Sequence, residues 1–571
     1  MKKFTSVKII LFLFLFISVP YFSFAQNWAW AKSAGGAMKV ESYAIAIDNA
    51  GNSYITGYFE DSLKFGTTTL FSSGSNPFVS NIFIAKYDIN GNFVWAQKAG
   101  GNNYDYGTGI ATDAVGNVYV TGLFTGTATF GTLSITSSTT DYDVFIAKYS
   151  PTGTALWVNK GGGSGWDVGS GVTIDNAGNC FITGSYRNTG TFGTTSFTSA
   201  GNYDAFVAKY DSNGTFLWAK SAGGTLEDKA LSIGTDITGN CYVSGFFNGT
   251  ATIGTATLIS SGNSDIWLAK YDNAGNFIWA KQAGGTQADE GKYLVTDAAG
   301  NSFMTGYFGG SALFGSGSNT VTLTSYGSED IFVGKFDYKG DIVWVKNYGG
   351  TLSDKAFAIS IDTAGHSYIA GSFFGTAQFD TITAISSNQD DAFVAGLDNL
   401  GKAKFLVQGG GANADVGSGI ATSLFGSCYT TGYFNGSVSF GSIPLISSGD
   451  NDLFIAKIDS AFIANQPNNI NDAAALIFDN LDVFPNPSNL DVTIQFELNK
   501  TKAQINIELY DVLGKLVTDK VIISELKSFS NKKQIVISRN NLPDGLYFGK
   551  IMVDNKLYTT RILFMNNASQ H

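Results

Sequence analysis

One block of sequence recurs seven times in this chain, and the recurrence constrains the fold more than any other feature. Each copy contains a Trp-Ala-Lys strand, Gly-Gly, an Asp, a turn of the form Asp-x-x-Gly-Asn, then Tyr-x-Thr-Gly, Phe-Gly and Asp-x-Phe-Ile-Ala-Lys. The Thr-Gly-type pairs end at glycines spaced 65, 62, 61, 61, 65 and 61 residues apart. A period of this length holds four strands, so the repeats predict an all-β, seven-bladed β-propeller over residues 26–459. The glycines are Gly57, Gly122, Gly184, Gly245, Gly306, Gly371 and Gly432.

The two ends of the repeat array are complementary. The last copy ends at Asp459 without a Trp strand, whereas Asn27–Lys32 is a Trp strand with no copy before it. We therefore expect Asn27–Lys32 to pair beside Leu453–Ile458. That pairing closes the ring and removes the exposed edge of an open array.

The first 25 residues are predicted to be a signal peptide rather than part of the fold. Lys2, Lys3 and Lys8 precede an apolar run over Ile9–Val19, and small residues follow at Ser23–Ala25. The run has eleven residues, whereas a membrane-spanning helix needs about twenty. We expect an exported protein without a transmembrane helix, either secreted or held at the cell surface after passing through the periplasm.

Charge and composition exclude several classes of function. The formal net charge is −11, and removing the lysine-rich leader makes the chain more acidic still, which disfavours nucleic acid as a partner. The chain has two histidines, His366 and His571, so histidine-based catalytic triads and zinc sites are not expected. We predict no metal and no cofactor.

Several residues recur at the same position in many of the repeats, and we call each such position a column. Their recurrence favours structural roles. Cys180, Cys241 and Cys428 occupy one column that holds Ser or Val in other copies, which predicts small buried side chains rather than disulfides. The Asp-x-x-Gly-Asn segments are expected to be tight turns capped by the Asp side chain. A further Asp column, four residues beyond Gly-Gly, is expected to bond the backbone where one blade crosses to the next. It comprises Asp105, Asp167, Asp228, Asp289, Asp354 and Asp415.

The repeats resemble the bacterial seven-bladed β-propeller repeats known as SBBP repeats. The match is carried by Trp218-Ala219-Lys220, Gly239–Gly245 and Asp265–Lys270, and it extends over residues 27–459. The last copy departs from the pattern, because Phe405 replaces the Trp before it and Ser423–Ser427 replaces the Asp turn. The resemblance implies an architecture and no single activity.

The periodicity stops after Asp459. Residues 460–478 are polar and irregular and are predicted to be a linker. Alternating apolar and polar residues over Val492–Phe496 and Ile505–Leu509 then predict a small Ig-like β-sandwich at residues 479–571.

Three motifs in this segment resemble the type A C-terminal sorting domain of the type IX secretion system of Bacteroidota. They are Val483–Pro487, Leu509–Lys515 and Leu542–Tyr547. The resemblance implies that the translocon of that system is a partner and reads this domain. The motif residues assigned in this way are Pro485, Asn486, Pro487, Gly514, Lys515, Gly545 and Tyr547.

Departures from the repeat pattern indicate where a ligand would bind. The long, variable loops gather at one end of a propeller, and around the third copy they carry Trp166, Arg187 and Tyr203. Aromatic rings beside a guanidinium suit a sugar and a carboxylate. We predict a non-catalytic binding or adhesion module for a glycan or a surface protein. The alternatives are a polysaccharide-degrading enzyme with a carboxylate pair and a structural surface element without a ligand.

Overall fold

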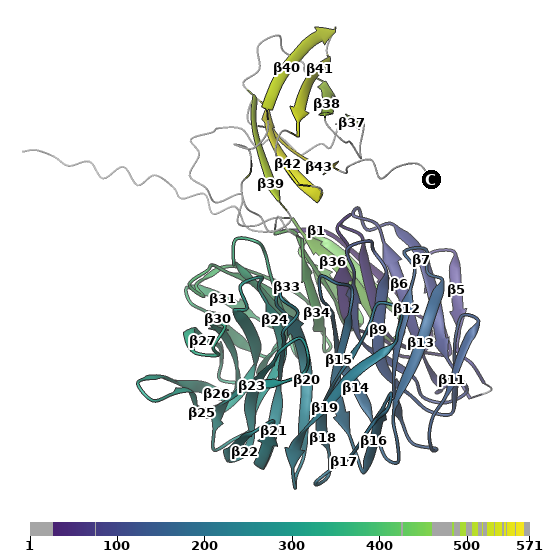
Figure 1. Cartoon of the computed structure of the whole chain (residues 1–571), viewed down its shortest axis with the longest axis vertical. Helices are drawn as coiled ribbons and strands as arrows, with labels where there is room; N and C mark the ends of the chain where they lie inside the picture. The colour runs from purple at the N-terminus through teal and green to yellow at the C-terminus, as the bar shows by residue number, and fades with distance from the viewer. Residues whose placement is uncertain are drawn as a thin grey trace, which may run out of the picture.

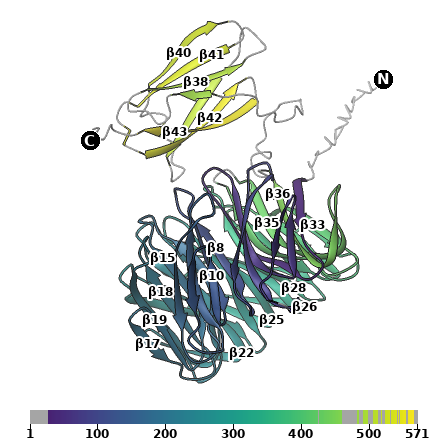
Figure 2. The same cartoon turned by 90° about the vertical axis from the view of Figure 1, so that its right-hand side faces the viewer.

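The computed structural model describes residues 27–74, 76–423 and 426–459, together with segments between residues 482 and 564. The signal peptide predicted at 1–25 and the linker predicted at 460–478 lie outside the described residues. Every helix or strand in the described residues is a β-strand, so this part of the chain is all-β (Figures 1 and 2). Neighbouring strands pair antiparallel, as the sequence predicts.

Each repeat contributes four main strands. The first strands are β2 (Val40–Ile47), β8 (Tyr106–Thr112), β14 (Val168–Ile174), β20 (Asp228–Thr235), β24 (Asp289–Thr296), β28 (Asp354–Ile361) and β34 (Val416–Thr422). The second strands are β3 (Ser53–Glu60), β9 (Val118–Phe124), β15 (Cys180–Tyr186), β21 (Cys241–Ile253), β25 (Ser302–Ser316), β29 (Ser367–Phe373) and β35 (Cys428–Phe440). The third strands are β6 (Ser80–Tyr87), β12 (Asp143–Tyr149), β18 (Asp204–Tyr210), β22 (Ala256–Tyr271), β26 (Asn319–Phe336), β32 (Asp391–Leu397) and β36 (Ile443–Ile458). The fourth strands are β7 (Phe93–Gly100), β13 (Ala155–Gly162), β19 (Phe216–Gly224), β23 (Phe277–Gly285), β27 (Ile342–Gly350), β33 (Ala403–Gly411) and, from the other end of the chain, β1 (Trp28–Ala34).

The turn between the first and second strands has the geometry that its sequence predicts. In the third repeat, Oδ1 of Asp175 accepts the backbone N–H groups of Ala177 and Asn179, while Oδ2 accepts the Asn179 side-chain amide. Gly178 adopts a φ of 82°, which a residue with a Cβ rarely adopts. All three of these hydrogen bonds are made within the turn.

A hairpin between the second and third strands joins each repeat to the one before it. The separate hairpins are β4 (Ser62–Phe65) with β5 (Thr68–Phe71), β10 (Thr127–Phe130) with β11 (Leu133–Thr136), β16 (Thr189–Phe192) with β17 (Thr195–Thr198), and β30 (Thr376–Phe379) with β31 (Ile382–Ile385). In the remaining repeats the hairpin is continuous with the second and third strands. The fourth strand of one repeat pairs with the hairpin of the next, as β13 does with β16.

The repeats form a closed cycle of contacts. Each first strand contacts the first strand of the following repeat, and β34 of the last repeat contacts β2 of the first. The N-terminal strand β1 pairs with β36, with Ala31 opposite Ala456 and Ala34 opposite Leu453. Figure 1 shows these two strands side by side. The predicted pairing of Asn27–Lys32 beside Leu453–Ile458 is confirmed.

A tryptophan in the fourth strand contacts the next repeat. The indole N–H of Trp157 donates to the carbonyl of Ser212 at 3.2 Å, 55 residues further along the chain. The indole also lies against Gly214, at the same turn, where φ is 82° and an added Cβ would sit 2.8 Å from the ring. Trp95, Trp218 and Trp344 make the equivalent hydrogen bond to the carbonyls of Pro151, Asn273 and Asn399.

This contact explains two irregularities in the sequence. Trp30 of the N-terminal strand lies against Gly91 in the first repeat, so its ring takes the position of the missing last tryptophan, although its indole N–H has no hydrogen-bond partner among the described residues. Phe405 precedes the last repeat, whose third and fourth strands come from opposite ends of the chain and share no turn. Among the described residues no turn joins those two strands, so the last repeat offers Phe405 no equivalent of the Ser212 carbonyl, in keeping with the replacement of Trp by Phe405.

Two glycines of the third repeat provide a test of this contact. Gly178 and Gly214 share a φ of 82°, but an added Cβ meets nothing closer than 3.5 Å at Gly178 and the Trp157 ring at 2.8 Å at Gly214. We expect Gly178→Ala to lower the free energy of unfolding by about 1–2 kcal/mol through backbone strain alone. Gly214→Ala should lower it by about 2–4 kcal/mol, because overpacking adds to the strain. Equal losses in denaturant titrations would contradict a role for the indole contact.

Buried aspartates occupy the junctions between repeats. In the fourth junction, Asp289 accepts the backbone N–H of Gly285 at 2.7 Å and that of Gly309 at 3.1 Å, as predicted for its column. Asp265 accepts the N–H of Ser261 through Oδ2, while its Oδ1 has no hydrogen-bond partner and the residue is fully buried. The same Oδ1 lacks a partner at the equivalent position of most repeats, namely at Asp143, Asp204, Asp330, Asp391 and Asp452.

The first repeat shows what the unpartnered oxygen lacks. Asn81 stands where the other repeats have this Asp, and its side-chain N–H group donates to the carbonyl of Gly101 at 2.8 Å and to Asp105 at 3.3 Å. A carboxylate in that place brings a second negative charge and no donor. Burial is the main cause that raises the pKa of Asp289 to about 7, with the neighbouring aspartate adding to it, and burial raises that of Asp265 to about 6. Burial also raises the pKa of Asp105, beside Asn81, to about 7.

These carboxyls predict a stability that falls as the pH rises. A carboxyl whose pKa is raised on folding stabilises the fold fully below about pH 4, its ordinary value, and loses that contribution through about pH 6 to 7. We expect the free energy of unfolding to decline between about pH 5 and pH 8. Asp265→Asn, which reproduces Asn81, should flatten the decline and stabilise the protein at pH 8 by about 1–3 kcal/mol.

A turn aspartate provides the control for this experiment. Burial raises the pKa of Asp272, but hydrogen bonds from Asn276, Ala274 and Gly275 together outweigh it and lower the pKa, so its contribution to stability is lost only in stronger acid. Asp272→Asn should therefore leave the slope between pH 5 and pH 8 unchanged. A wild-type stability that is flat or rises over this interval would contradict the prediction.

The described C-terminal segments form two small antiparallel sheets. One has the order β37 (Asp482–Phe484), β38 (Asp491–Glu497), β41 (Lys532–Ser538) and β40 (Ile522–Phe529), and the other the order β39 (Ile505–Asp511), β42 (Gly545–Val553) and β43 (Lys556–Phe564). Buried apolar side chains include Val492, Leu509, Ile537 and Ile562. The alternation predicted over Val492–Phe496 and Ile505–Leu509 is thus confirmed as strands.

Candidate binding face

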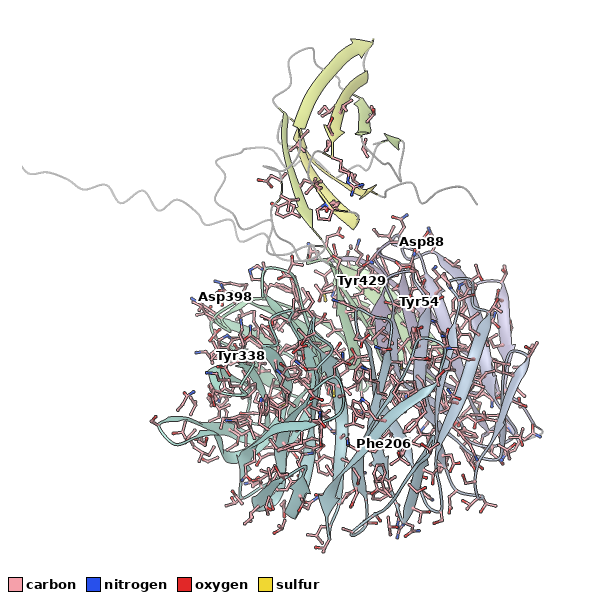
Figure 3. All side chains as sticks on the ribbon, viewed as in Figure 1. Tyr54, Asp88, Phe206, Tyr338, Asp398 and Tyr429 are labelled. Carbon is pink, nitrogen blue, oxygen red and sulfur yellow. The ribbon has the colours of Figure 1, made fainter. Side chains whose placement is uncertain are left out.

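The two ends of the propeller differ in the connections that they carry. Because successive strands are antiparallel, the Asp-capped turns gather at one end, while the Gly-Gly crossings and the second-to-third connections gather at the other. We call these the turn end and the loop end. Figure 3 labels Asp88 and Asp398, which cap turns at the turn end. The loop end carries the irregular residues that the sequence singled out.

Arg187 and Tyr203 are brought together at the loop end. Arg187 follows β15 and Tyr203 precedes β18, and these two strands pair with each other. The Arg187 guanidinium carbon lies 5.9 Å from the centre of the Tyr203 ring. The backbone N–H of Arg187 donates to the buried Asp167 at 3.0 Å, which fixes the start of the loop.

Arg187 has no carboxylate partner among the described residues. Its side chain is exposed, and no ion pair or side-chain hydrogen bond of Arg187 occurs within residues 27–74, 76–423 and 426–459. A guanidinium presents several N–H donors in a plane, a geometry that suits a carboxylate. Arg187 is therefore available to an anionic group of a ligand.

Tyr203 also contacts a lysine of the next repeat. Lys229 Nζ lies 4.8 Å from the centre of the ring and 2.6 Å from a carboxylate oxygen of Glu227. Tyr203 and Glu227 are joined by a parallel bridge between their backbones. The result is a patch with two cations on one aromatic ring and one nearby carboxylate.

Trp166 forms a second aromatic contact rather than joining this patch. Its ring meets that of Tyr142, from the preceding repeat, edge to face at 5.2 Å. The backbone N–H of the next residue, Asp167, donates to the Tyr142 carbonyl at 2.9 Å. Half of the Trp166 side chain remains exposed. Arg187 and Tyr203 therefore contact each other, whereas Trp166 contacts Tyr142 of the preceding repeat.

Sequence reasoning missed a polar network near the closing junction. Glu41 accepts hydrogen bonds from the hydroxyl of Tyr43 at 3.0 Å and from Asn451 of the last repeat at 2.8 Å. Tyr58 and Tyr106 meet edge to face at 4.7 Å beside it. The signal was available, because Glu41 follows the position where Val40 replaces the column Asp.

A second missed group surrounds Tyr307. Its ring lies 4.4 Å from Lys355 Nζ and 5.3 Å from Lys292 Nζ. Glu290 pairs with Lys292 at 2.6 Å, and Glu329 lies 3.8 Å from Lys355. Lysines, carboxylates and tyrosines thus recur around the loop end in several repeats.

No metal centre is evident in the part of the chain that the structure describes. No group of three or more His, Cys, Asp or Glu side chains there is placed to hold a metal ion. Cys180, Cys241 and Cys428 are free and buried, in agreement with the packing role predicted for them. Burial raises the pKa of each thiol, which disfavours the reactive thiolate.

The sorting-motif residues are described only in part. Gly545 and Tyr547 lie at the start of β42, and the Tyr547 hydroxyl donates to the carbonyl of Pro543 at 3.0 Å. Pro485, Asn486, Pro487, Gly514 and Lys515 lie outside the described residues. Among the described residues there is no helix long and apolar enough to cross a membrane.

Family models match two parts of the chain. Residues 94–123 match a family described as Beta-propeller repeat, SBBP. Residues 482–565 match a family described as Secretion system C-terminal sorting domain. The chain therefore contains β-propeller repeats and ends in a sorting domain that implies export through the type IX secretion system.

Curated relatives match parts of much longer proteins. An uncharacterized WD repeat-containing protein, L264, of Acanthamoeba polyphaga mimivirus is 26% identical over 66% of this chain and 34% of that protein. The regulatory protein FlaEY of Caulobacter vibrioides is 27% identical over 30% of this chain and 20% of that protein. The chain thus spans about a third and a fifth of their lengths.

A solved structure also aligns with much of the chain. It is a structural genomics protein of unknown function from Bacteroides thetaiotaomicron, 12% identical with a TM-score of 0.25. The alignment covers 74% of this chain and 98% of that one.

Proposed function

We propose that this chain, built from β-propeller repeats and a secretion sorting domain, is an exported, non-catalytic binding or adhesion protein. It recognises a glycan or a surface protein through the loop end of the propeller. The observation that carries the proposal is the exposed Arg187 guanidinium, stacked on Tyr203 and without a carboxylate partner among the described residues.

The chemistry of the patch favours a ligand with a carboxylate. Arg187 and Lys229 both face Tyr203, and Glu227 offsets only one of the two charges. The half-exposed Trp166 offers an apolar surface on a separate loop at the same end, suited to the face of a sugar ring. An acidic glycan satisfies both features, and so does an acidic segment of a protein surface.

We also infer the finer architecture from the contacts described above. The cycle of first strands, together with the pairing of β1 and β36, supports a closed propeller of seven blades. The two sheets of the C-terminal segment support a small Ig-like β-sandwich. The domain limits then follow the sequence: a propeller at 26–459 and a sorting domain at 479–571.

A polysaccharide-degrading enzyme is the second candidate. Glu41 and Glu60 lie on adjacent strands of the first repeat, and burial raises the pKa of Glu60, as a general acid requires. However, Glu41 is already bonded by Tyr43 and Asn451, which bridges the closing junction. This favours a structural role for Glu41 over a role as nucleophile or base.

The binding patch can be tested with arrays of acidic and neutral glycans and of surface proteins. If Trp166 contacts the ligand, Trp166→Ala should weaken binding by about 1–3 kcal/mol, the value of burying a large apolar side chain. Arg187→Lys should also weaken binding, because an ammonium does not present the planar fork of a guanidinium. Both variants are expected to fold as the wild type does, since the two side chains are exposed.

Tyr338→Ala provides the matched control. Tyr338 is an aromatic residue of similar exposure at the turn end, labelled in Figure 3, so its loss should leave binding unchanged. Unchanged affinity in both loop-end variants would remove the patch from consideration. Turnover of a polysaccharide by the purified protein would overturn the non-catalytic assignment.

The sorting domain predicts the route of export. Deletion from residue 480 onward should leave a folded propeller in the periplasm, because the translocon partner reads the C-terminal domain. Fractionation of cells that carry a type IX secretion system, with protease resistance as a measure of folding, checks this. Normal appearance of the truncated chain outside the cell would contradict the assignment.

A further inference from the structure

A cavity lies between the fourth and fifth repeats, away from the loop-end patch. Its volume is about 200 Å³, and it is bounded by β22, β23 and the hairpin shared by β25 and β26. Figure 1 shows this hairpin extending outward from the propeller. The cavity belongs to the outer part of the ring, where one repeat joins the next.

The walls of the cavity are largely apolar. Ile266, Leu268, Met304 and Phe336 are buried and form its inner surface, and Ile342 lies at the start of β27. Two polar side chains in the wall are already engaged. Gln282 exchanges hydrogen bonds with the backbone of Ile259, and Asn319 donates to the carbonyl of Ile342.

One ion pair contributes to the lining of the cavity. Lys281 Nζ lies 3.0 Å from Asp341 Oδ1, and the two side chains are 35% and 50% exposed. The pair is therefore in contact with solvent and can exchange partners at low cost. It supplies one donor and one acceptor beside an otherwise apolar space.

The fifth repeat differs from the third and fourth repeats at two places beside the cavity. In the fifth repeat the hairpin extends beyond Phe314 to Ser316 and Asn319, which pair with each other. In the third repeat Phe192-Gly193-Thr194-Thr195 forms the turn directly. The fifth repeat therefore contains a four-residue insertion. Ile342 also stands where Phe216 and Phe277 occupy the third and fourth repeats. A branched aliphatic side chain thus replaces a phenyl ring at the lining of the cavity.

We propose that this cavity binds a small uncharged molecule, or an uncharged group of a larger ligand, built on a single aromatic ring. The apolar walls and the missing phenyl ring fit such a group, and a cavity of about 150 Å³ with similar walls holds benzene. A sugar is disfavoured, because its hydroxyl groups would meet few free polar partners. A single polar substituent on the ring would reach the Lys281–Asp341 pair.

Indole is a suitable probe, because it combines an aromatic body with one N–H donor. In the full-length chain labelled with ¹³C at the methionine methyl groups, indole should shift the Met304 resonance saturably and leave that of Met38 unchanged. Met304 lines the cavity, so this measurement needs no substitution. Absence of a saturable Met304 shift would overturn the proposal.

A pair of substitutions in β27 completes the test. Ile342→Phe restores the ring present in the third and fourth repeats and should weaken indole binding at least tenfold. Val343→Phe adds the same ring at the next position, where the side chain is exposed, and should leave binding unchanged. Indole affinity that is unaffected by Ile342→Phe would place the binding elsewhere and overturn the proposal.

Discussion

The contact between a fourth-strand tryptophan and the turn of the next repeat is the constraint on which the remaining structure depends. It joins an indole N–H to a carbonyl about 55 residues away and places the ring on a glycine. Only a glycine satisfies both demands, because the backbone has a positive φ and a Cβ would overlap the ring. The Trp and Gly columns of the sequence are therefore two sides of one contact between neighbouring repeats.

Because this contact runs in one direction around the ring, its exceptions are informative. Trp30 reaches from the N-terminal strand to the first repeat, and Phe405 occurs where the next repeat has no turn between its third and fourth strands in the described part of the chain. The aspartates at the junctions between repeats also have one exception. Asn81 supplies the donor that an Asp at its position lacks, so the junctions are equivalent in geometry but not in charge.

Much of the fold was predictable because each repeat pairs its strands, and buries their faces against the next repeat, in the same way. Residues that recur at the same position in the copies predict the capping turns, the Asp column that bonds the backbone and the buried cysteines. The strand missing from the last copy and present before the first predicts the closing pair. The role of Lys209 was not predicted. Its ammonium lies 3.6 Å from Asp175 and 4.5 Å from the Phe181 ring. Lys148 and Lys270 make the equivalent ion pairs with Asp113 and Asp236, so the contact recurs with the repeats, but the sequence alone does not show which carboxylate the ammonium meets.

The candidate site was less predictable, for a related reason. Sequence analysis placed Trp166, Arg187 and Tyr203 on one end of the ring, yet which of them meet depends on loops from three repeats. The partner of Trp166 is Tyr142 of the preceding repeat, and that of Tyr203 includes Lys229 of the following one. The hairpin insertion was visible as a spacing of 65 residues, but the space beside it depends on side-chain volumes.

The pairing of β1 with β36 sets the order in which the molecule can be completed. The strand made first on the ribosome has as its partner a strand made more than 400 residues later, a contact of very high sequence separation. Contacts of this kind form slowly, because a long loop must close before they contribute. Until then β1 has no partner strand and presents an open edge to other chains. A nascent chain, or one truncated before β36, is therefore more prone to strand exchange and aggregation than the complete chain.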